Sequence, residues 1–442
     1  MFRQLTIPSL LKEGKKTAVL AVPLVIGQVS QMLMIVADTV MVGNVGVTEL
    51  AALSFANAVF AIPFVFGIGL ITSISVLSSG AAGRKDEAAA RATCRNGFYL
   101  ALASGLALFL LSAFLIPFLS FFGQPANVTA AAPPYLFLIL ISLVPALGSM
   151  GLKNHGDSLD HPWPSFFIFL GGVLLNIALN QLFIFNLGYG LVGAGWATLI
   201  SRITILVAMM IWLDRSKSLK QFTPNRWLAR PDPATLRKLL TLGIPASFHL
   251  LAEVGAFSAT GFLIGFYGEI SLASHQIALT TGGTLFMIPL GLSIALTMRM
   301  GNAAGAQEKE RYPAIILSGW IITLLFATLT SLFCGLGKDF IAPLYNDDPE
   351  VIALAAKFLL VIAVFQFVDA IQVASGGILR GLEDVTMPAW TAVLSYWFFG
   401  IPLGWLIATK GDLGPIGVWW GLAIGLTVAS IILTARVFKI AR

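Results

Sequence analysis

The sequence predicts an all-α polytopic membrane protein, with twelve transmembrane helices in two six-helix lobes related by a parallel internal repeat. Of its 442 residues, 57% are hydrophobic and 11% are charged, and the mean hydropathy is +0.88. A soluble domain carries about 25% charged residues. So few charged side chains could not cover an apolar globule of this size, and lipid must therefore surround most of its surface.

Twelve apolar runs are long enough to cross about 30 Å of hydrocarbon. They cover residues 17–41, 51–77, 96–121, 133–152, 164–187, 191–213, 239–266, 272–298, 312–335, 351–379, 388–409 and 415–435. No small-residue cleavage site precedes the first run's extension past Met34, so we expect the first helix to be a retained anchor.

The basic residues predict that both termini are cytoplasmic. With that orientation, most of the 27 lysines and arginines, including Arg3, Arg380 and Arg442, fall in cytoplasmic segments. Only Lys338 and Lys410 fall outside. Positive charge concentrates on the cytoplasmic side of membrane proteins, so the bias supports this topology.

The chain divides at a basic, proline-containing stretch. We expect an N-terminal lobe over 1–213, a cytoplasmic linker over 214–238 and a C-terminal lobe over 239–442. A shift of 222 residues superposes Pro23 on Pro245, Gly46 on Gly268, Ala51 on Ala273, Gly69 on Gly291 and Gly83 on Gly305, and a shift of 226 superposes Pro162 on Pro388. Each half has six spans of the same orientation, which predicts a repeat axis along the membrane normal and alternating access between the lobes.

Five charged residues fall inside predicted spans: Asp38, Arg202, Glu253, Lys357 and Asp369. Each costs about 2.5–3.5 kcal/mol at the bilayer centre on insertion scales. An interior partner for Arg202, or snorkelling of Lys357 at a span end, would account for the two cations. The cost of the three carboxylates suggests that they have a function, although they could simply hydrogen-bond helices together.

Polar residues accompany each carboxylate on its helix face. His249 precedes Glu253 by one turn, Gln366 and Gln372 flank Asp369 at intervals of three, and Gln31 lies seven residues before Asp38. In the repeat, Gln31 is the counterpart of Glu253, and the counterpart of Asp369 is near Leu143 or Leu147. The carboxylate pair therefore belongs to the second lobe. Because burial favours the protonated form of a carboxylate, such a pair can bind a proton or a desolvated cation.

At these residues the sequence resembles the multidrug and toxic compound extrusion (MATE) family, and specifically its NorM branch. The resemblance lies in Asp-Thr-Val-Met-Val-Gly at 38–43, Leu-Gly-Ile-Pro at 242–245 through Glu253, Ala-Ser-His-Gln-Ile at 273–277, Met-Ile-Pro-Leu-Gly at 287–291, Asp-Ala-Ile-Gln at 369–372 and Leu-Arg-Gly at 379–381. It extends over nearly the whole chain.

The resemblance implies specific roles for these residues. Glu253 and Asp369 would form the cation site, which could hold sodium, and Asp38 would take part in proton or substrate coupling. The substrate-cavity candidates are Gln31, Phe365, Gln366, Gln372, His249, Asn176 and Asn180. A sibling branch has an aspartate on the fifth helix, where this chain has only the two asparagines. Phe365 stands where some sodium-coupled members have a tyrosine, which weakens the case for sodium over protons.

The expected function is a secondary antiporter in the bacterial inner membrane that exports amphipathic organic cations in exchange for protons or sodium. We expect a monomer without a cofactor. The alternative within the superfamily is a lipid-linked oligosaccharide flippase, whose anionic cargo should favour basic residues in the cavity. An intramembrane enzyme or a structural bundle would show no gradient-dependent flux.

Other motifs do not indicate an enzyme or a nucleic-acid-binding protein. The GxGxxG match at 188–193 joins two spans without a βαβ unit, and the lysine-rich start lacks the first glycine of a P-loop. The histidines His155, His161, His249 and His275 lack metal-ligand spacing. The linker has little aromatic interleaving, so we expect no nucleic-acid binding.

Overall fold

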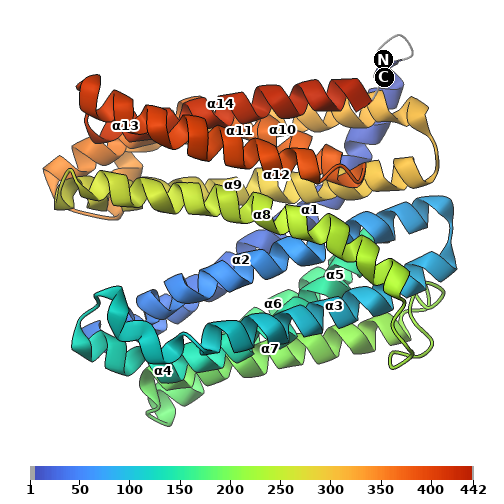
Figure 1. Ribbon diagram of the computed structural model, residues 1–442, viewed down its shortest axis with the longest axis horizontal. Helices are drawn as coiled ribbons and strands as arrows, with labels where there is room; N and C mark the ends of the chain where they lie inside the picture. Colours follow the sequence, from blue (N-terminus) through green and yellow to red (C-terminus); the bar gives the residue numbers. More distant parts are fainter. Residues whose placement is uncertain (1–4, 441–442) are drawn as a thin grey trace. The chain divides into compact units, whose positions relative to one another are not determined.

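The computed structural model describes residues 5–440, which are helical along most of their length (Figure 1). Twelve helices or joined helices of this part of the chain are long and apolar enough to cross a membrane, and no strand occurs in it. The predicted all-α fold with twelve spans is confirmed. Arg3 and Arg442, which were used to predict the orientation, lie outside the described residues.

The elements of the first half are α1 (Ile7–Gly43), α2 (Val47–Arg84), α3 (Glu87–Ala113), η2 (Ile116–Phe122), α4 (Ala126–Ile141), α5 (Leu143–Ser158), α6 (Pro162–Asn180), η3 (Gln181–Asn186) and α7 (Gly190–Arg215). Those of the second half are α8 (Pro233–Gly265), α9 (Glu269–Gly305), η4 (Lys309–Arg311), α10 (Tyr312–Ile341), η5 (Ala342–Leu344), α11 (Pro349–Gly381), α12 (Thr386–Ala392), η6 (Val393–Gly400), α13 (Ile401–Lys410) and α14 (Pro415–Ile440). The elements η3 and η6 are π-helical, whereas η2, η4 and η5 are 3₁₀ turns.

Several helices continue past the apolar runs that predicted them. The first helix begins at Ile7, ten residues before its apolar run, and α2 continues to Arg84 rather than ending at residue 77. Hydropathy marks only the hydrocarbon, whereas a helix continues until a residue terminates it. Here Lys85 adopts the left-handed conformation at φ 56°, and Asp86 caps α3 by accepting a hydrogen bond from the Ala89 amide at 2.9 Å.

The backbone contacts divide the chain into two compact units. One holds Ile26–Ser247, and the other holds the chain up to Val25 together with the chain from Phe248 onward. The divisions therefore lie inside α1 and α8. The lobe boundaries predicted from the sequence, 1–213 and 239–442, stay a prediction.

One contact, repeated in both units, explains why α1 and α8 are divided. A Cβ atom on Gly69 of α2 would lie 2.3 Å from the Cα atom of Ser247 in α8. A Cβ atom on Gly291 of α9 would lie 2.8 Å from the Cα atom of Val25 in α1. Both pairs are related by the 222-residue shift. Only glycine allows the backbones to approach so closely, so each unit includes the first part of one of these two helices.

The connection between α7 and α8 is shorter and better packed than the predicted linker over 214–238. It is the irregular segment 216–232, and it lies against α3. The Arg91 guanidinium donates to the Gln221 carbonyl at 2.6 Å, and the Tyr99 hydroxyl donates to the Ala229 carbonyl at 2.8 Å. Leu219 is fully buried. The segment is polar in composition, yet it is ordered, because side chains of α3 hydrogen-bond to its backbone.

The start of α8 is fixed by Asp232. Its carboxylate accepts hydrogen bonds from the Thr235 side chain and from the amides of Thr235 and Ala234, and its own amide donates to the Asn96 side chain at 2.8 Å. These bonds, of which the one from the Thr235 hydroxyl contributes most, lower the pKa of Asp232 below its usual value. The cap therefore stays ionised at neutral pH.

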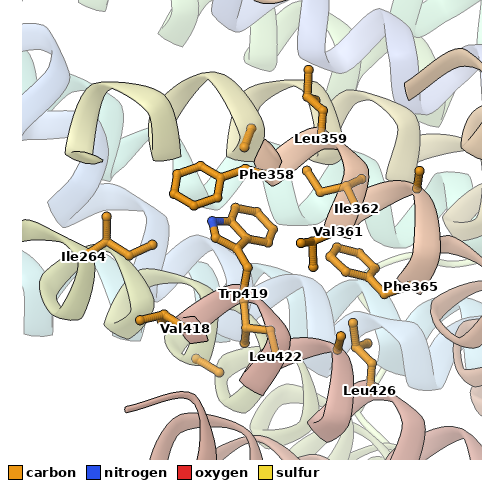
Figure 2. Packing of buried hydrophobic residues seen from close by; sticks show 14 of the residues in the cluster. Ile264, Phe358, Leu359, Val361, Ile362, Phe365, Val418, Trp419, Leu422 and Leu426 are labelled. Atoms are coloured by element: carbon orange, nitrogen blue, oxygen red, sulfur yellow. The ribbon is translucent and has the colours of Figure 1, made fainter. Parts of the chain in front are cut away.

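In the unit that contains the C-terminal half, α11 packs against α9, α10 and α14 (Figure 1). Trp419 of α14 is 1% exposed, and its ring lies between Phe358 and Phe365 of α11 (Figure 2). The rings of Phe365 and Trp419 are nearly parallel, with an interplanar angle of 9° and centroids 6.1 Å apart. This aromatic packing fixes α11, the helix that carries Asp369, against α14.

The other face of α11 approaches α9 through glycines. A Cβ atom on Gly377 would lie 2.4 Å from the Ser293 carbonyl oxygen, and one on Gly381 would lie 2.5 Å from that of Thr297. The hydroxyl of Ser293 donates to the Val373 carbonyl at 2.7 Å across the same contact. The two helices therefore cannot separate or accept larger residues here without losing hydrogen bonds.

We predict that Gly377→Ala destabilises the protein by about 1–3 kcal/mol, because the added methyl group would overlap the backbone of α9. Gly283→Ala on α9 is the matched control, since a Cβ atom there would meet nothing within 4 Å. That change should be neutral or stabilising by up to about 1 kcal/mol, from helix propensity alone. Thermal unfolding followed by tryptophan fluorescence measures both, and equal shifts would contradict the packing argument.

Candidate functional site

The predicted carboxylate pair lies in one unit, with Glu253 in the part of α8 from Phe248 onward and Asp369 in α11. Glu253 of α8 and Asp369 of α11 are both buried, with 9% and 6% of their surface exposed, and their charges interact. The hydroxyl of Tyr396 donates to Oε1 of Glu253 at 3.4 Å. Two buried carboxylates within electrostatic reach repel each other when both are ionised, so a bound cation or proton would stabilise the pair.

A π-helical segment positions the tyrosine. Tyr396 lies in η6, which interrupts the eleventh span between α12 and α13, and it is completely buried. The next residue, Trp397, donates from its indole nitrogen to the Ala252 carbonyl at 3.0 Å, which ties η6 to α8 beside Glu253. A π-turn widens a helix and turns a side chain inward, and such turns frequently occur at functional sites. Tyr396 could not be identified from the sequence, because a π-turn leaves no clear mark in hydropathy.

The remaining predicted polar residues of this unit are also buried. Gln366, Gln372 and His249 have 6% or less of their surface exposed, and Gly376 of α11 faces the His249 ring. Several buried polar atoms have no hydrogen-bond partner among residues 5–440; in this unit they include His249 Nε2, Thr281 Oγ1, Gln372 Oε1, Thr391 Oγ1 and Ser395 Oγ. Oxygen atoms of this kind, with the carboxylates, are the ligands that a hard cation prefers. No cluster of three or more His, Cys, Asp or Glu side chains suited to a metal ion occurs in the described chain.

Phe365 takes part in the site differently from the other candidates. Its side chain is directed to Trp419, and it is 6% exposed (Figure 2). It therefore supplies packing one turn before Asp369 and no oxygen ligand. Its role in a substrate cavity stays a prediction.

Arg380 belongs to this polar cluster, although it follows the predicted span over 351–379. The structure continues α11 to Gly381, two residues past the predicted end of the span, and buries Arg380 to 8% exposure. Its Nη2 atom donates to the Ser293 hydroxyl at 2.7 Å, and its charge acts on Glu253 and His249. The spacing was the available signal: Arg380 follows Asp369 by three turns on one helix face.

The third carboxylate lies in the unit formed by Ile26–Ser247. Asp38 of α1 is 7% exposed and accepts a hydrogen bond from the Asn180 amide of α6 at 2.6 Å. The Thr198 hydroxyl of α7 donates to its other oxygen at 3.3 Å, and Asn176 bonds both Asn180 and Thr198. The two predicted asparagines are therefore the direct environment of Asp38. Thr198 was missed, because one threonine in an apolar span carries no distinctive signal.

The intramembrane cations have the surroundings expected of structural residues. Arg202 donates to the Ser142 hydroxyl at 2.7 Å, and its guanidinium lies over Phe60, 5.1 Å from the ring centroid. Its charge also acts on Asp38. Lys357 is exposed.

Gln31 is half-buried and donates to the Gln28 side chain at 3.2 Å.

We predict that Asn180→Leu destabilises the protein by about 1.5–3 kcal/mol, because Asp38 loses a charge-assisted hydrogen bond in a buried site. Asp38→Asn in the same background should recover part of the loss. Asn44→Leu, at an exposed position of α1, should stay within about 0.5 kcal/mol of the wild type. Thermal unfolding of these proteins, of Asp38→Asn alone and of the wild type checks this, and an equal effect of Asn180→Leu with and without the carboxylate would contradict it.

Known proteins resemble this chain over nearly its whole length. The sequence model of the MatE family matches the chain twice, at residues 23–182 and 245–406, which confirms the internal repeat. The multidrug resistance protein MdtK of Pectobacterium atrosepticum is 32% identical over 441 residues, covering 97% of this chain and 95% of that protein. The probable multidrug resistance protein NorM of Mannheimia succiniciproducens is 32% identical over 439 residues, covering 97% and 94%.

Solved structures have the same fold. The eukaryotic MATE transporter AtDTX14 has a TM-score of 0.90 at 20% identity, covering 97% of this chain and 96% of that chain. A variant of the Vibrio cholerae MATE transporter VcmN has a TM-score of 0.91 at 19% identity, covering 98% of each chain. The twofold match to the family model and the full-length similarity to NorM-like proteins lead to one conclusion: this chain belongs to the MatE family, in its NorM-like branch.

Proposed function

We propose that this protein is a secondary active multidrug efflux antiporter that exports amphipathic organic cations in exchange for protons or sodium. The buried carboxylate pair Glu253 and Asp369 is the observation that carries the proposal. A buried negative charge attracts cations that shed their water easily, as amphipathic organic cations do. The relatives named as multidrug resistance proteins support the same reading.

In this proposal, a proton or sodium ion entering from outside competes with the substrate for Glu253 and Asp369. Occupation by one or the other shifts the balance between outward-open and inward-open conformations, because each ligand binds one of them better. Asp38 contributes to coupling from the other unit, where Asn180 and Thr198 hold its carboxylate. The export step then needs no nucleotide.

The proposal also places the protein in the bacterial inner membrane as a monomer, with both termini in the cytoplasm and lobes that comprise residues 1–213 and 239–442. The distribution of lysines and arginines supports this orientation. The MdtK and NorM relatives from bacteria support the location. Flippase activity is less favoured, because the buried arginines Arg202 and Arg380 already bond serine hydroxyls and lie near carboxylates.

We predict that Glu253→Gln and Asp369→Asn each reduce gradient-driven efflux to the level of empty vesicles. Both changes remove an ionisable group with little change of volume, so the melting temperature should change by only a few degrees. A pH or sodium gradient imposed on proteoliposomes that contain a fluorescent organic cation provides the measurement. The repeat offers a matched control, because Gln31→Leu should be milder than Glu253→Leu. Normal efflux by either carboxylate variant would remove that residue from the coupling mechanism.

We predict that protons alone drive transport. A proton needs one acceptor, whereas sodium needs several oxygen ligands, and Phe365 supplies none at its turn of α11. In sodium-free proteoliposomes, an inward-acid gradient should suffice to move the substrate. Transport that stays silent at every pH until sodium is added would show that other oxygens, such as those of Gln372 and Ser395, complete a sodium site.

A further inference from the structure

Arg380 is a buried charge for which the proposed coupling cycle has no role. Its side chain makes one hydrogen bond, from Nη2 to the Ser293 hydroxyl at 2.7 Å, and its Nε atom has no partner among the described residues. A serine hydroxyl does not neutralise a guanidinium. Burying such a charge costs several kcal/mol unless an opposite charge compensates it.

Glu253 is the acidic group whose charge acts on Arg380. Glu253 also interacts with Asp369, whereas Asp369 lies three turns from Arg380 along α11, a rise of about 16 Å. The contact of Gly376, one turn before Arg380, with the His249 ring brings the part of α8 that carries Glu253 against this end of α11. The other ionisable groups around these three charges are His249 and Tyr396.

Other charged side chains near this end of α11 have partners of their own. Arg299 of α9 pairs with Glu13 of α1, and Asp384 accepts a hydrogen bond from Arg436 of α14 at 2.7 Å. They leave Glu253 as the acidic group available to Arg380 inside the cluster.

The internal repeat gives an independent argument. The counterpart of Arg380 in the first half is Asn154, at the shift of 226, and it makes the equivalent contact: its amide donates to the Ile71 carbonyl at 3.1 Å. Ile71 is itself the counterpart of Ser293 at the shift of 222. The same helix contact is thus made by a neutral amide in the half that lacks the carboxylate pair, and by an arginine in the half that has it. Contact between the two helices alone does not require the charge.

We propose that Arg380 is the internal counter-charge of Glu253, which leaves the Glu253 and Asp369 pair with one net negative charge for an external cation. This inference deepens the proposed cation-coupling function and rests on it. One monovalent cation, whether the coupling ion or the substrate, then neutralises the site. Arg380 is a positioning residue in this scheme, because it acts on the cation through Glu253 and does not contact it.

The test is a double-mutant cycle between Arg380→Gln and Glu253→Gln, with two readouts at one fixed pH in sodium-free buffer. The first is the affinity for tetraphenylphosphonium as a probe cation. Arg380→Gln should bind the probe about tenfold more tightly, which corresponds to 1.4 kcal/mol and to one partly screened charge interaction. Glu253→Gln should bind it more weakly, and the double variant should return close to the wild type.

The second readout is the melting temperature, which needs no transport or ligand. Arg380→Gln leaves Glu253 uncompensated and should lower it by several degrees, whereas adding Glu253→Gln should restore most of the loss. If Arg380→Gln does not fold, the double variant decides: its folding supports the inference, and its failure overturns it. Additive effects of the two changes on the melting temperature, or unchanged or weaker probe binding by Arg380→Gln, would also overturn it.

Three controls separate charge from packing. Arg380→Lys keeps the charge and should resemble the wild type in probe affinity, and Ser293→Ala removes the hydrogen bond while keeping the charge. Lys357→Gln removes a positive charge from an exposed position of the same helix and should change neither readout. If the wild type itself does not bind the probe while the melting temperatures show the rescue, the proposed cation-coupling function fails and the pairing of Arg380 with Glu253 stands.

Discussion

The structure depends on one constraint: the hydrocarbon of the bilayer contains no water to which polar groups could hydrogen-bond. It forces the backbone into helices, whose amides and carbonyls bond one another, and it forces every buried side-chain charge to find a partner inside the protein. Asp38 meets this demand with Asn180, Thr198 and the nearby charge of Arg202. Glu253 meets it with Tyr396 and the charge of Arg380, whereas the charge acting on Asp369 is that of Glu253, another carboxylate.

The internal repeat makes this difference interpretable. Its two halves share the close glycine contacts of Gly69 and Gly291, and the contacts of Asn154 and Arg380 with the neighbouring helix. The second half carries both members of the carboxylate pair and the arginine, whereas the equivalent positions of the first half have neutral residues. At these repeat-related positions, charge therefore occurs in one half without a change in the helix packing that both halves use. That separation lets packing hold the fold while the buried charges remain available for binding.

Local helix irregularity supplies the detail of the site. The π-turn of η6 places Tyr396 against Glu253, and the indole of Trp397 fastens the same turn to α8. On the other side of α11, Gly377 and Gly381 bring α9 close enough for Ser293 to hold Arg380. The aromatic packing of Phe358, Phe365 and Trp419 keeps α11 fixed between these contacts. The carboxylates are thus held by rigid helices rather than by loops.

The sequence by itself determined the fold class, the number of spans, the repeat and the carboxylates, because a bilayer imposes a strong requirement on hydropathy and makes each intramembrane charge conspicuous. The NorM-like family was recognisable from the same residues. Tertiary structure alone decided the helix ends, which depend on caps such as Asp86, and the partners of each charge, which come from helices distant in sequence. Hydropathy placed Arg380 just past the end of its span, because a window average cannot tell an exposed cation beyond a helix from one buried in the last turn of that helix. Only the packing of α8, α9 and α11 around it made that distinction.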